Sequence, residues 1–140
     1  MITIKRAYDP PNHNDGCRIL VDRLWPRGIK KDQLGIKKWV RELGPSNELR
    51  KFFGHDSARW KEFRTRYLTE LKRPEAASLI GELVGLARRG PLTLIYSAKD
   101  TEHNQAVVLK ELLDSKVNSR RRLILERQAG SPTRAIGSES

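Results

Sequence analysis

The sequence predicts a single α/β domain of three layers, in which helices flank a mainly parallel sheet. The main observation is the run LTLIYSA at residues 92–98, which is uncharged, favours β structure and lies between two stretches of helical periodicity. A strand enclosed by helices in this way is typical of α/β folds. The length of 140 residues suits one such domain, because it allows one substantial core but not two.

Two further strands are predicted before this run. Residues 2–8 alternate apolar and polar side chains, which indicates a half-buried strand. Residues 9–16, DPPNHNDG, are turn-forming types. The segment 17–25 follows, and its contiguous apolar residues 19–21 favour a central position in the sheet.

Helices are predicted for most of the remaining chain. Residues 29–55 indicate several short helical pieces instead of one long element. An N-cap at Asp56 and an apolar face predict a longer helix after it. The next helix has Pro74 in its first turn and ends at Arg88-Arg89-Gly90. The last predicted helix spans 106–113.

The periodic pattern weakens from Val117 onward, where the run RRRLILERQ is compatible with a last strand or a helical turn and QAGSPTRAIGSES is typical of a flexible tail. We therefore predict an α/β domain over residues 1–116 and a basic, flexible C-terminal tail over residues 117–140.

The chain is strongly basic. It carries 28 Lys and Arg against 17 Asp and Glu, a formal net charge of +11. Residues 1–114 contain 22 of the basic and 15 of the acidic side chains, so the folded part is basic as well as the tail. This charge predicts attraction to anions such as phosphorylated metabolites, nucleotides or nucleic acid. A basic solvated surface without a dedicated partner is the alternative.

The composition also predicts the compartment. No apolar run approaches the roughly 18 residues of a membrane span. The chain begins directly with a strand pattern, so we expect no signal peptide. Its one cysteine rules out an internal disulfide and suits a reducing environment. We therefore predict a cytoplasmic protein without membrane association.

Two loops that follow predicted strands carry polar side chains suited to a ligand site. The first loop contains Asp22, Arg23, Trp25 and Arg27, and the second contains Tyr96, Ser97, Lys99, Asp100, His103 and Asn104. Ligands of open, mainly parallel sheets bind beyond the carboxyl ends of the strands. The second loop also leads into a helix N-terminus, which favours an anion. We therefore expect the two loops to face one another across a small-molecule site.

Each of these residues has a functional and a structural interpretation. In the functional one, Arg23 and Arg27 hold an anionic group, Asp22 or Asp100 orients it, and His103 transfers a proton. In the structural one, Asp22 and Arg23 form an ion pair, Asp100 caps the helix that follows, and His103 lies on the surface.

Motifs of several enzyme classes are missing. Cys17 opens a strand instead of occupying a strand-to-helix loop, which excludes cysteine-based phosphatase or sulfurtransferase chemistry. The three histidines, His13, His55 and His103, lack metal-ligand spacing. The glycine fingerprints of dinucleotide and triphosphate sites are not found. We therefore predict no metal and no bound cofactor.

Four motifs carry a family resemblance. They are VDRLWPRG (21–28), GPSNELRKFFGHD (44–56), RWKEFRTRYLTEL (59–71) and LTLIYSAKDTEHNQAVVLKELL (92–113). Together with Trp39 they cover most of residues 1–114, and in this order they resemble the YeaO-like branch of the bacterial family known as domain of unknown function 488, DUF488. Beyond about residue 116 the chain departs from the family pattern.

The resemblance implies a single α/β domain but supplies no reaction. An Asp-x-Arg-like element and a later acidic, histidine-containing turn of the family correspond here to Asp22, Arg23, Arg27, Asp100, His103 and Asn104. The matched middle motifs add Arg50, His55 and Arg64 as candidates for ligand binding. Some members are labelled as transcriptional regulators, but this sequence contains no helix-turn-helix pair with an exposed recognition helix.

Three functions follow from these observations. The first is an enzyme acting on a small anionic or nucleotide-like molecule. The second is a nucleic-acid-binding or regulatory module that uses its basic surface, with the RRR run at 120–122 as an additional anchor. The third is a sensor that binds a metabolite without converting it. The sequence does not separate the first from the third.

Overall fold

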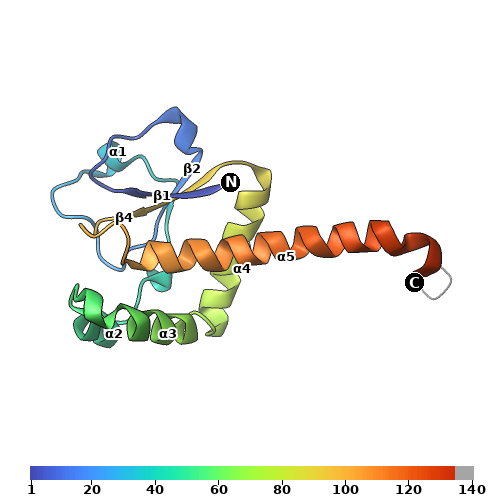
Figure 1. Ribbon diagram of the computed structural model, residues 1–140. Helices are drawn as coiled ribbons and strands as arrows, with labels where there is room; N and C mark the ends of the chain where they lie inside the picture. The colour runs from blue at the N-terminus through green and yellow to red at the C-terminus, as the bar shows by residue number, and fades with distance from the viewer. Residues whose placement is uncertain (135–140) are drawn as a thin grey trace.

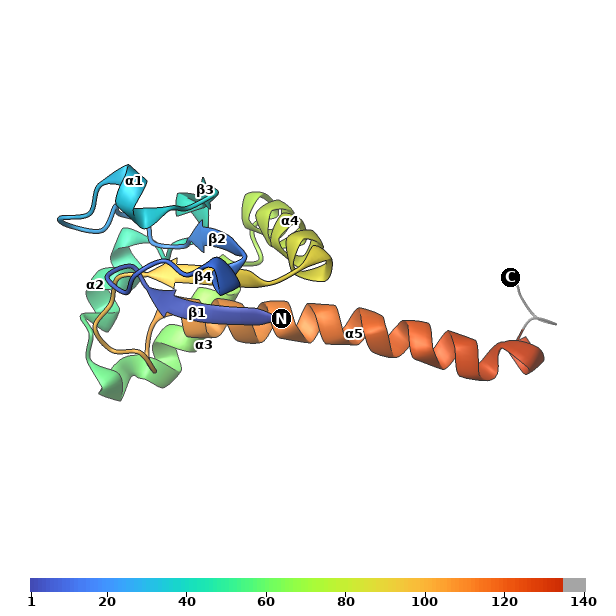
Figure 2. The ribbon, with the colours of Figure 1, turned by 90° about the horizontal axis from the view of Figure 1, so that it is seen from above.

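The computed structural model describes residues 1–134 and the side chains of residues 1–119. Within that range a four-stranded sheet is accompanied by five α-helices (Figures 1 and 2). The strands are β1 (Ile2–Arg6), β2 (Cys17–Leu20), β3 (Lys38–Trp39) and β4 (Leu92–Tyr96). The helices are α1 (Lys31–Leu34), α2 (Asn47–Phe53), α3 (Trp60–Glu70), α4 (Pro74–Arg89) and α5 (Gln105–Arg134).

The sheet has the strand order β1-β4-β2-β3 and is parallel throughout. Every strand therefore ends at the same edge, and the loops that follow β2 and β4 are neighbours. The central strand β4 is buried along its whole length, as its uncharged sequence predicts. The chain is thus a single α/β domain.

Two details of the predicted strands are wrong. The strand predicted over 17–25 ends at Leu20, although the Val21 N–H still donates to the Ile95 carbonyl at 3.0 Å. Residues 38–39 form β3 beside β2, where only helical pieces were expected. A strand of two residues is too short to show an alternating pattern.

The two faces of the sheet are covered unequally. On one face, helices α2 to α5 pack against strand residues such as Ile19, Leu92 and Leu94 to form the main core. On the opposite face, a small cluster around Leu20 and Ile95 is covered by α1 and neighbouring loops. Figure 1 shows α1 above the sheet and α2, α3 and α5 below it. The helical layers are therefore present, but one is reduced to a single turn.

The last helix is longer than its sequence pattern indicates. The helix predicted over 106–113 is α5, which continues without interruption to Arg134. The boundary predicted after residue 116 thus lies inside this helix, and residues 135–140 of the predicted tail lie outside the described residues. Among the α5 side chains described, which end at residue 119, Val117 is the last buried one, and the helix projects away from the domain (Figure 2).

None of the helices within residues 1–134 combines the length and apolar character needed to cross a membrane.

Candidate functional site

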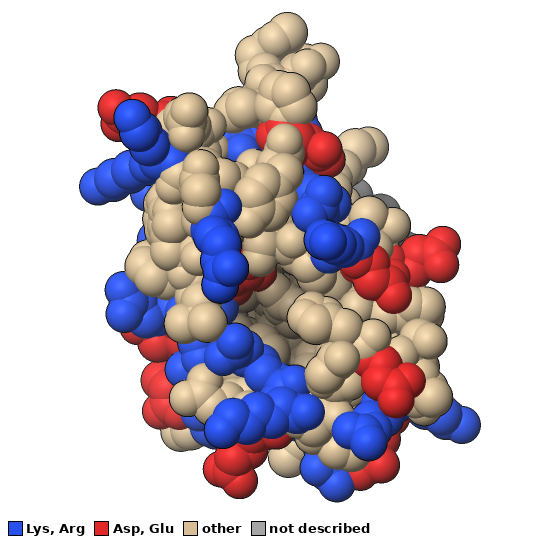
Figure 3. Space-filling model, turned by 90° about the vertical axis from the view of Figure 1, so that its left-hand side faces the viewer, with Lys and Arg blue, Asp and Glu red and all other residues tan. Residues whose placement is uncertain are grey.

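A pocket with a volume of about 900 Å³ opens at the carboxyl ends of β2 and β4, which is within the usual range for small-molecule sites. Figure 3 shows it as a hollow with Lys and Arg side chains around its mouth. The loops after the two strands form much of the lining, and further lining residues come from α2 and its flanking residues, from Tyr8 after β1 and from Phe63 of α3. The pocket brings together nine of the predicted residues, namely Asp22, Arg23, Arg27, Arg50, His55, Lys99, Asp100, His103 and Asn104.

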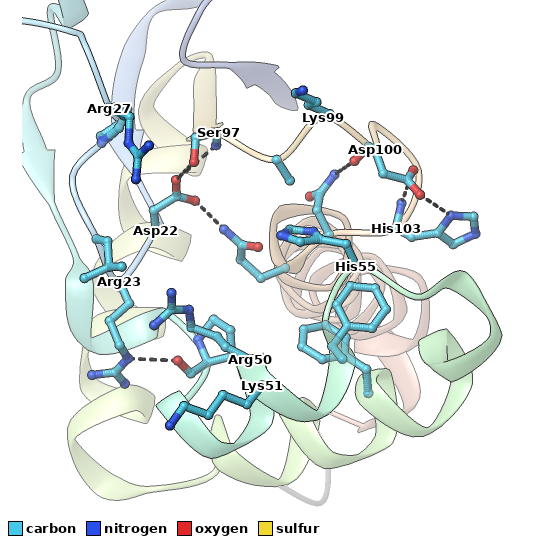
Figure 4. A pocket seen from close by; sticks show the side chains of 18 of the residues that line it. Asp22, Arg23, Arg27, Arg50, Lys51, His55, Ser97, Lys99, Asp100 and His103 are labelled. Atoms are coloured by element: carbon cyan, nitrogen blue, oxygen red, sulfur yellow. Dashed lines mark hydrogen bonds and ion pairs between the residues drawn. The ribbon is translucent and has the colours of Figure 1, made fainter.

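Asp22 is a buried carboxylate on the pocket lining, with a side chain held in place by residues of the β4–α5 connection. It is 7% exposed. Its Oδ2 atom accepts hydrogen bonds from the Ser97 N–H at 3.0 Å and from the Ser97 hydroxyl, and its Oδ1 atom accepts one from the Gln105 amide (Figure 4). Burial raises the pKa of Asp22, because removing water disfavours the charged form, and these hydrogen bonds oppose that rise only in part.

The raised pKa of Asp22 has a consequence for stability. The folded state retains this proton to a higher pH than the unfolded chain does, so the free energy of unfolding decreases as the pH rises from below 3.8 through the raised pKa. We expect Asp22→Asn, which has no titratable group at this position, to remove this decrease and to be the more stable of the two proteins at pH 7.

Urea unfolding of the two proteins between pH 3 and pH 8 would measure this difference. The difference should be small at acid pH and grow toward neutral pH. A difference that does not change with pH, or an asparagine variant that is less stable at pH 7, would contradict it.

Several contacts fix the backbone around Asp22. The Trp39 indole N–H donates to the Asp22 carbonyl at 2.7 Å. Gly44 lies so close to Arg23 that a Cβ atom at residue 44 would approach the backbone nitrogen of Arg23 to 2.7 Å. Arg6 holds the opposite loop by donating to the Ser97 and Ala98 carbonyls. These contacts hold in place the two loops that line the pocket, the one after β2 and the one after β4.

Four exposed cations surround the pocket. Among the described residues, the side chains of Arg27, Lys51 and Lys99 take part in no hydrogen bond or ion pair. Arg50 donates only to the Asn47 side chain, at 2.9 Å, and its charge also lowers the pKa of Asp22 slightly. The described part of the protein therefore leaves most of the donors of these four side chains unused.

Arg23 lines the pocket as predicted, but the protein itself uses several of its donors. Its guanidinium donates to the Pro45 carbonyl at 2.8 Å and to the Gly44 carbonyl at 3.1 Å, and in Figure 4 it points away from Asp22. The alternative ion pair between Asp22 and Arg23 is therefore wrong. Arg23 connects two loops of the pocket, and this use of its donors reduces what it can offer an anion.

Asp100 and His103 form a pair on the side of the pocket away from Asp22 (Figure 4). The Asp100 Oδ2 and His103 Nδ1 atoms are 2.9 Å apart, and Asp100 Oδ1 accepts the Glu102 and His103 N–H groups. The backbone hydrogen bond from Glu102 and the contact with His103 hold the pKa of Asp100 below its usual range. The His103 ring packs edge-on against Trp60, with centroids 5.2 Å apart.

The helix cap is provided by Asn104, so the prediction that Asp100 caps this helix is wrong. The Asn104 Oδ1 atom accepts the Val107 N–H at 3.2 Å, and its Nδ2 group donates to the Asp100 carbonyl. Asp100 instead closes the turn that precedes the helix. Asn104 is the cap because α5 begins at Gln105, the residue directly after it, whereas Asp100 lies four residues earlier.

His55 comes from the segment after α2 and has a left-handed backbone, with φ of 59°. Residues in this conformation are uncommon and are often found at binding sites. Figure 4 shows its ring across the pocket from Asp22. Arg64, by contrast, is not part of the pocket lining, and its guanidinium pairs with Glu111 of α5 at 2.9 Å.

Sequence reasoning missed several members of the site. Gln105 and Lys51 directly follow the predicted candidates Asn104 and Arg50, but nothing in their types distinguishes them from solvated side chains. Ser97 belongs to the loop that the sequence does predict, but its hydrogen bonds to Asp22 are evident only from the structure.

The fold and the pocket define a class of protein: a small open-sheet α/β domain with a cation-rimmed pocket beyond the carboxyl ends of its strands. Comparison with known proteins then identifies the family. The sequence model described as "Inactive DUF488-N3 subclade" matches residues 1–134. The chain belongs to the DUF488 family, in its YeaO-like branch.

Individual relatives agree with this assignment. The chain is 49% identical over 114 residues to the uncharacterized protein YeaO of Escherichia coli, covering 81% of this chain and 97% of that protein. It is 34% identical over 115 residues to the uncharacterized protein Mb3100c of Mycobacterium bovis, covering 82% and 95%. No solved structure matches the chain significantly.

Proposed function

We propose that this domain is a non-catalytic binding module for a small phosphorylated, nucleotide-like molecule. The observation that carries the proposal is the ring of cations around a pocket of about 900 Å³. Their side chains have no strong protein partner among the described residues, as shown above, and they gather on the face where the pocket opens (Figure 3). A phosphate group at the mouth would provide those partners.

The chemistry of the cations suits a phosphate. A guanidinium group presents parallel N–H donors that match two phosphate oxygens, and such charge-assisted hydrogen bonds are stronger than neutral ones. Arg27 and Arg50 approach the pocket from different elements, so together they can hold one anion from two sides. The start of α5 at Gln105 lies in the same lining, and its helix dipole also favours negative charge.

Two observations favour binding without turnover. The matching family model is described as inactive. In the pocket, the hydrogen bond of the Ser97 hydroxyl is directed at Asp22, whereas His103 is paired with Asp100 and packed against Trp60. A serine nucleophile needs an adjacent base, and a general base must reach the proton that it takes. Among the described residues no hydrogen bond joins the Ser97 hydroxyl to His103, so the pocket lacks a serine–histidine relay, and its hydrogen bonds support the positioning of a ligand.

A ligand titration tests the proposal directly. We expect ribose 5-phosphate and adenosine monophosphate to raise the Tm by at least about 2 °C at roughly 5 mM, whereas adenosine, which lacks the phosphate, has a smaller effect. The shift should decrease as salt screens the exposed cations. Chromatography after a long incubation should recover both compounds unchanged.

Two results would contradict the proposal. If neither the Tm nor calorimetry shows binding of a phosphorylated compound, the proposed anion site is wrong. Conversion of a bound compound would replace the non-catalytic function with an enzymatic one.

A further inference from the structure

The least expected feature of a cation-rimmed pocket is a buried carboxylate in its lining. A site that binds only phosphate does not require Asp22, because a negative side chain repels an anion and is costly to bury. Asp22 is 7% exposed, and none of the ion pairs within the described residues includes it. A buried carboxylate at this position therefore indicates that the ligand also carries a hydrogen-bond donor.

We propose that the ligand combines its anionic group with an N–H donor that Asp22 accepts, as in a nucleoside monophosphate with an amino-bearing base. This inference rests on the proposed function, and it deepens it by naming the chemical class of the second ligand group. The cations bind the phosphate, and the carboxylate selects the base.

The geometry of the carboxylate leaves capacity for such a group. A carboxylate has about four acceptor positions. Within the described part of the chain three donors reach Asp22, two from Ser97 on Oδ2 and one from Gln105 on Oδ1. One position on Oδ1 is therefore available to a ligand. The same three hydrogen bonds fix the carboxylate plane, so its orientation is set before a ligand enters.

The distribution of charge matches a molecule with two different ends. Arg27, Arg50, Lys51 and Lys99 are exposed around the mouth, whereas Asp22 is buried. The lining also includes the ring of Phe53 and, opposite Asp22 in Figure 4, the imidazole of His55. Aromatic side chains of this kind stack on nucleobases irrespective of sequence.

The ionisation of Asp22 supports the same assignment. Burial raises its pKa, so the charged form is poorly stabilised by the protein alone. An N–H donor from a ligand would stabilise the charged form, whereas a carbonyl oxygen at the same position would meet it with repulsion. The pocket should therefore distinguish an amino group from an oxo group at the same ring position.

Two matched pairs of nucleotides test this inference by calorimetry on the full chain. Adenosine and inosine monophosphate differ in an amino or oxo group, and so do cytidine and uridine monophosphate. We expect the amino member of at least one pair to bind about tenfold more tightly than its partner and than ribose 5-phosphate. In Asp22→Asn this preference should fall to within about twofold. Binding of ribose 5-phosphate should be unchanged or stronger, because a negative charge has been removed.

The control is Asp32→Asn, which removes one carboxylate from an exposed position on α1 outside the pocket and should preserve the preference. Equal binding of all four nucleotides and ribose 5-phosphate would overturn the inference and leave the phosphate site intact. So would a preference that persists in Asp22→Asn. Failure of ribose 5-phosphate and every nucleotide to bind would instead overturn the proposed function itself, and this inference with it.

Discussion

The double substitution Arg27→Ala and Arg50→Ala is expected to weaken the binding of ribose 5-phosphate by about a hundredfold. Each guanidinium would lose a charge-assisted hydrogen bond to the phosphate, and the positive potential at the mouth of the pocket would fall. Both side chains are exposed, and the loss of their few protein contacts should leave the Tm almost unchanged. Calorimetry at a fixed ionic strength would measure the change in affinity.

A matched control separates local contacts from net charge. The double substitution Lys61→Ala and Arg88→Ala also removes two exposed positive charges, but both residues lie outside the pocket. We expect it to change the affinity by less than about threefold, because salt screens distant charges. An equal loss in both double variants would show that the phosphate is attracted by overall charge without a defined site.

The largest effect on stability is expected for Phe63→Ala, which should lower the free energy of unfolding by about 3–5 kcal/mol. The Phe63 ring is 2% exposed and stacks against Phe53 at a centroid distance of 4.4 Å and against Tyr67 at 5.6 Å. Removing it leaves a cavity beneath α2, the helix that carries Arg50. Domains are stable by only about 5–15 kcal/mol, so the variant should unfold at much lower urea concentration.

The neighbouring Phe52 provides the comparison. It is half-buried and contacts the Arg59 and Arg66 guanidinium groups, so Phe52→Ala should cost less than half as much. Similar losses in the two variants would contradict the prediction, because they would mean that the deeper burial of Phe63 does not set the cost of removing its ring.

The fold was largely predictable because its main elements have local signatures. The uncharged run at 92–98 becomes the central strand β4, and Pro74 begins α4. Two elements were not predictable in the same way. The strand β3 has two residues and exists only because β2 pairs with it. The extent of α5 beyond Val117 has no apolar periodicity, which is the signal that sequence reasoning uses to recognise a helix.

The positions of the site residues were also predictable, since parallel strands place their following loops at one edge of the sheet. The directions in which these side chains point were not predictable. Arg23 and Arg27 stand in one loop and are chemically equivalent in the sequence, yet Arg23 donates to backbone carbonyls of the chain before α2, whereas Arg27 lies at the mouth of the pocket. His103 is predicted from the sequence to transfer a proton, and only the structure shows that its ring packs against Trp60 and that its Nδ1 atom pairs with Asp100.

The sequence by itself determined the class of fold, the family and the two loops that meet at the pocket, because these depend on the order and spacing of residues along the chain. Only the tertiary structure decided what each polar side chain does. The hydrogen bond between Gln105 and Asp22 joins residues 83 positions apart, and the one between Ser97 and Asp22 joins residues 75 apart. Contacts of this range arise from strand pairing and helix packing, and they make Asp22 an oriented, buried acceptor instead of a solvated acid.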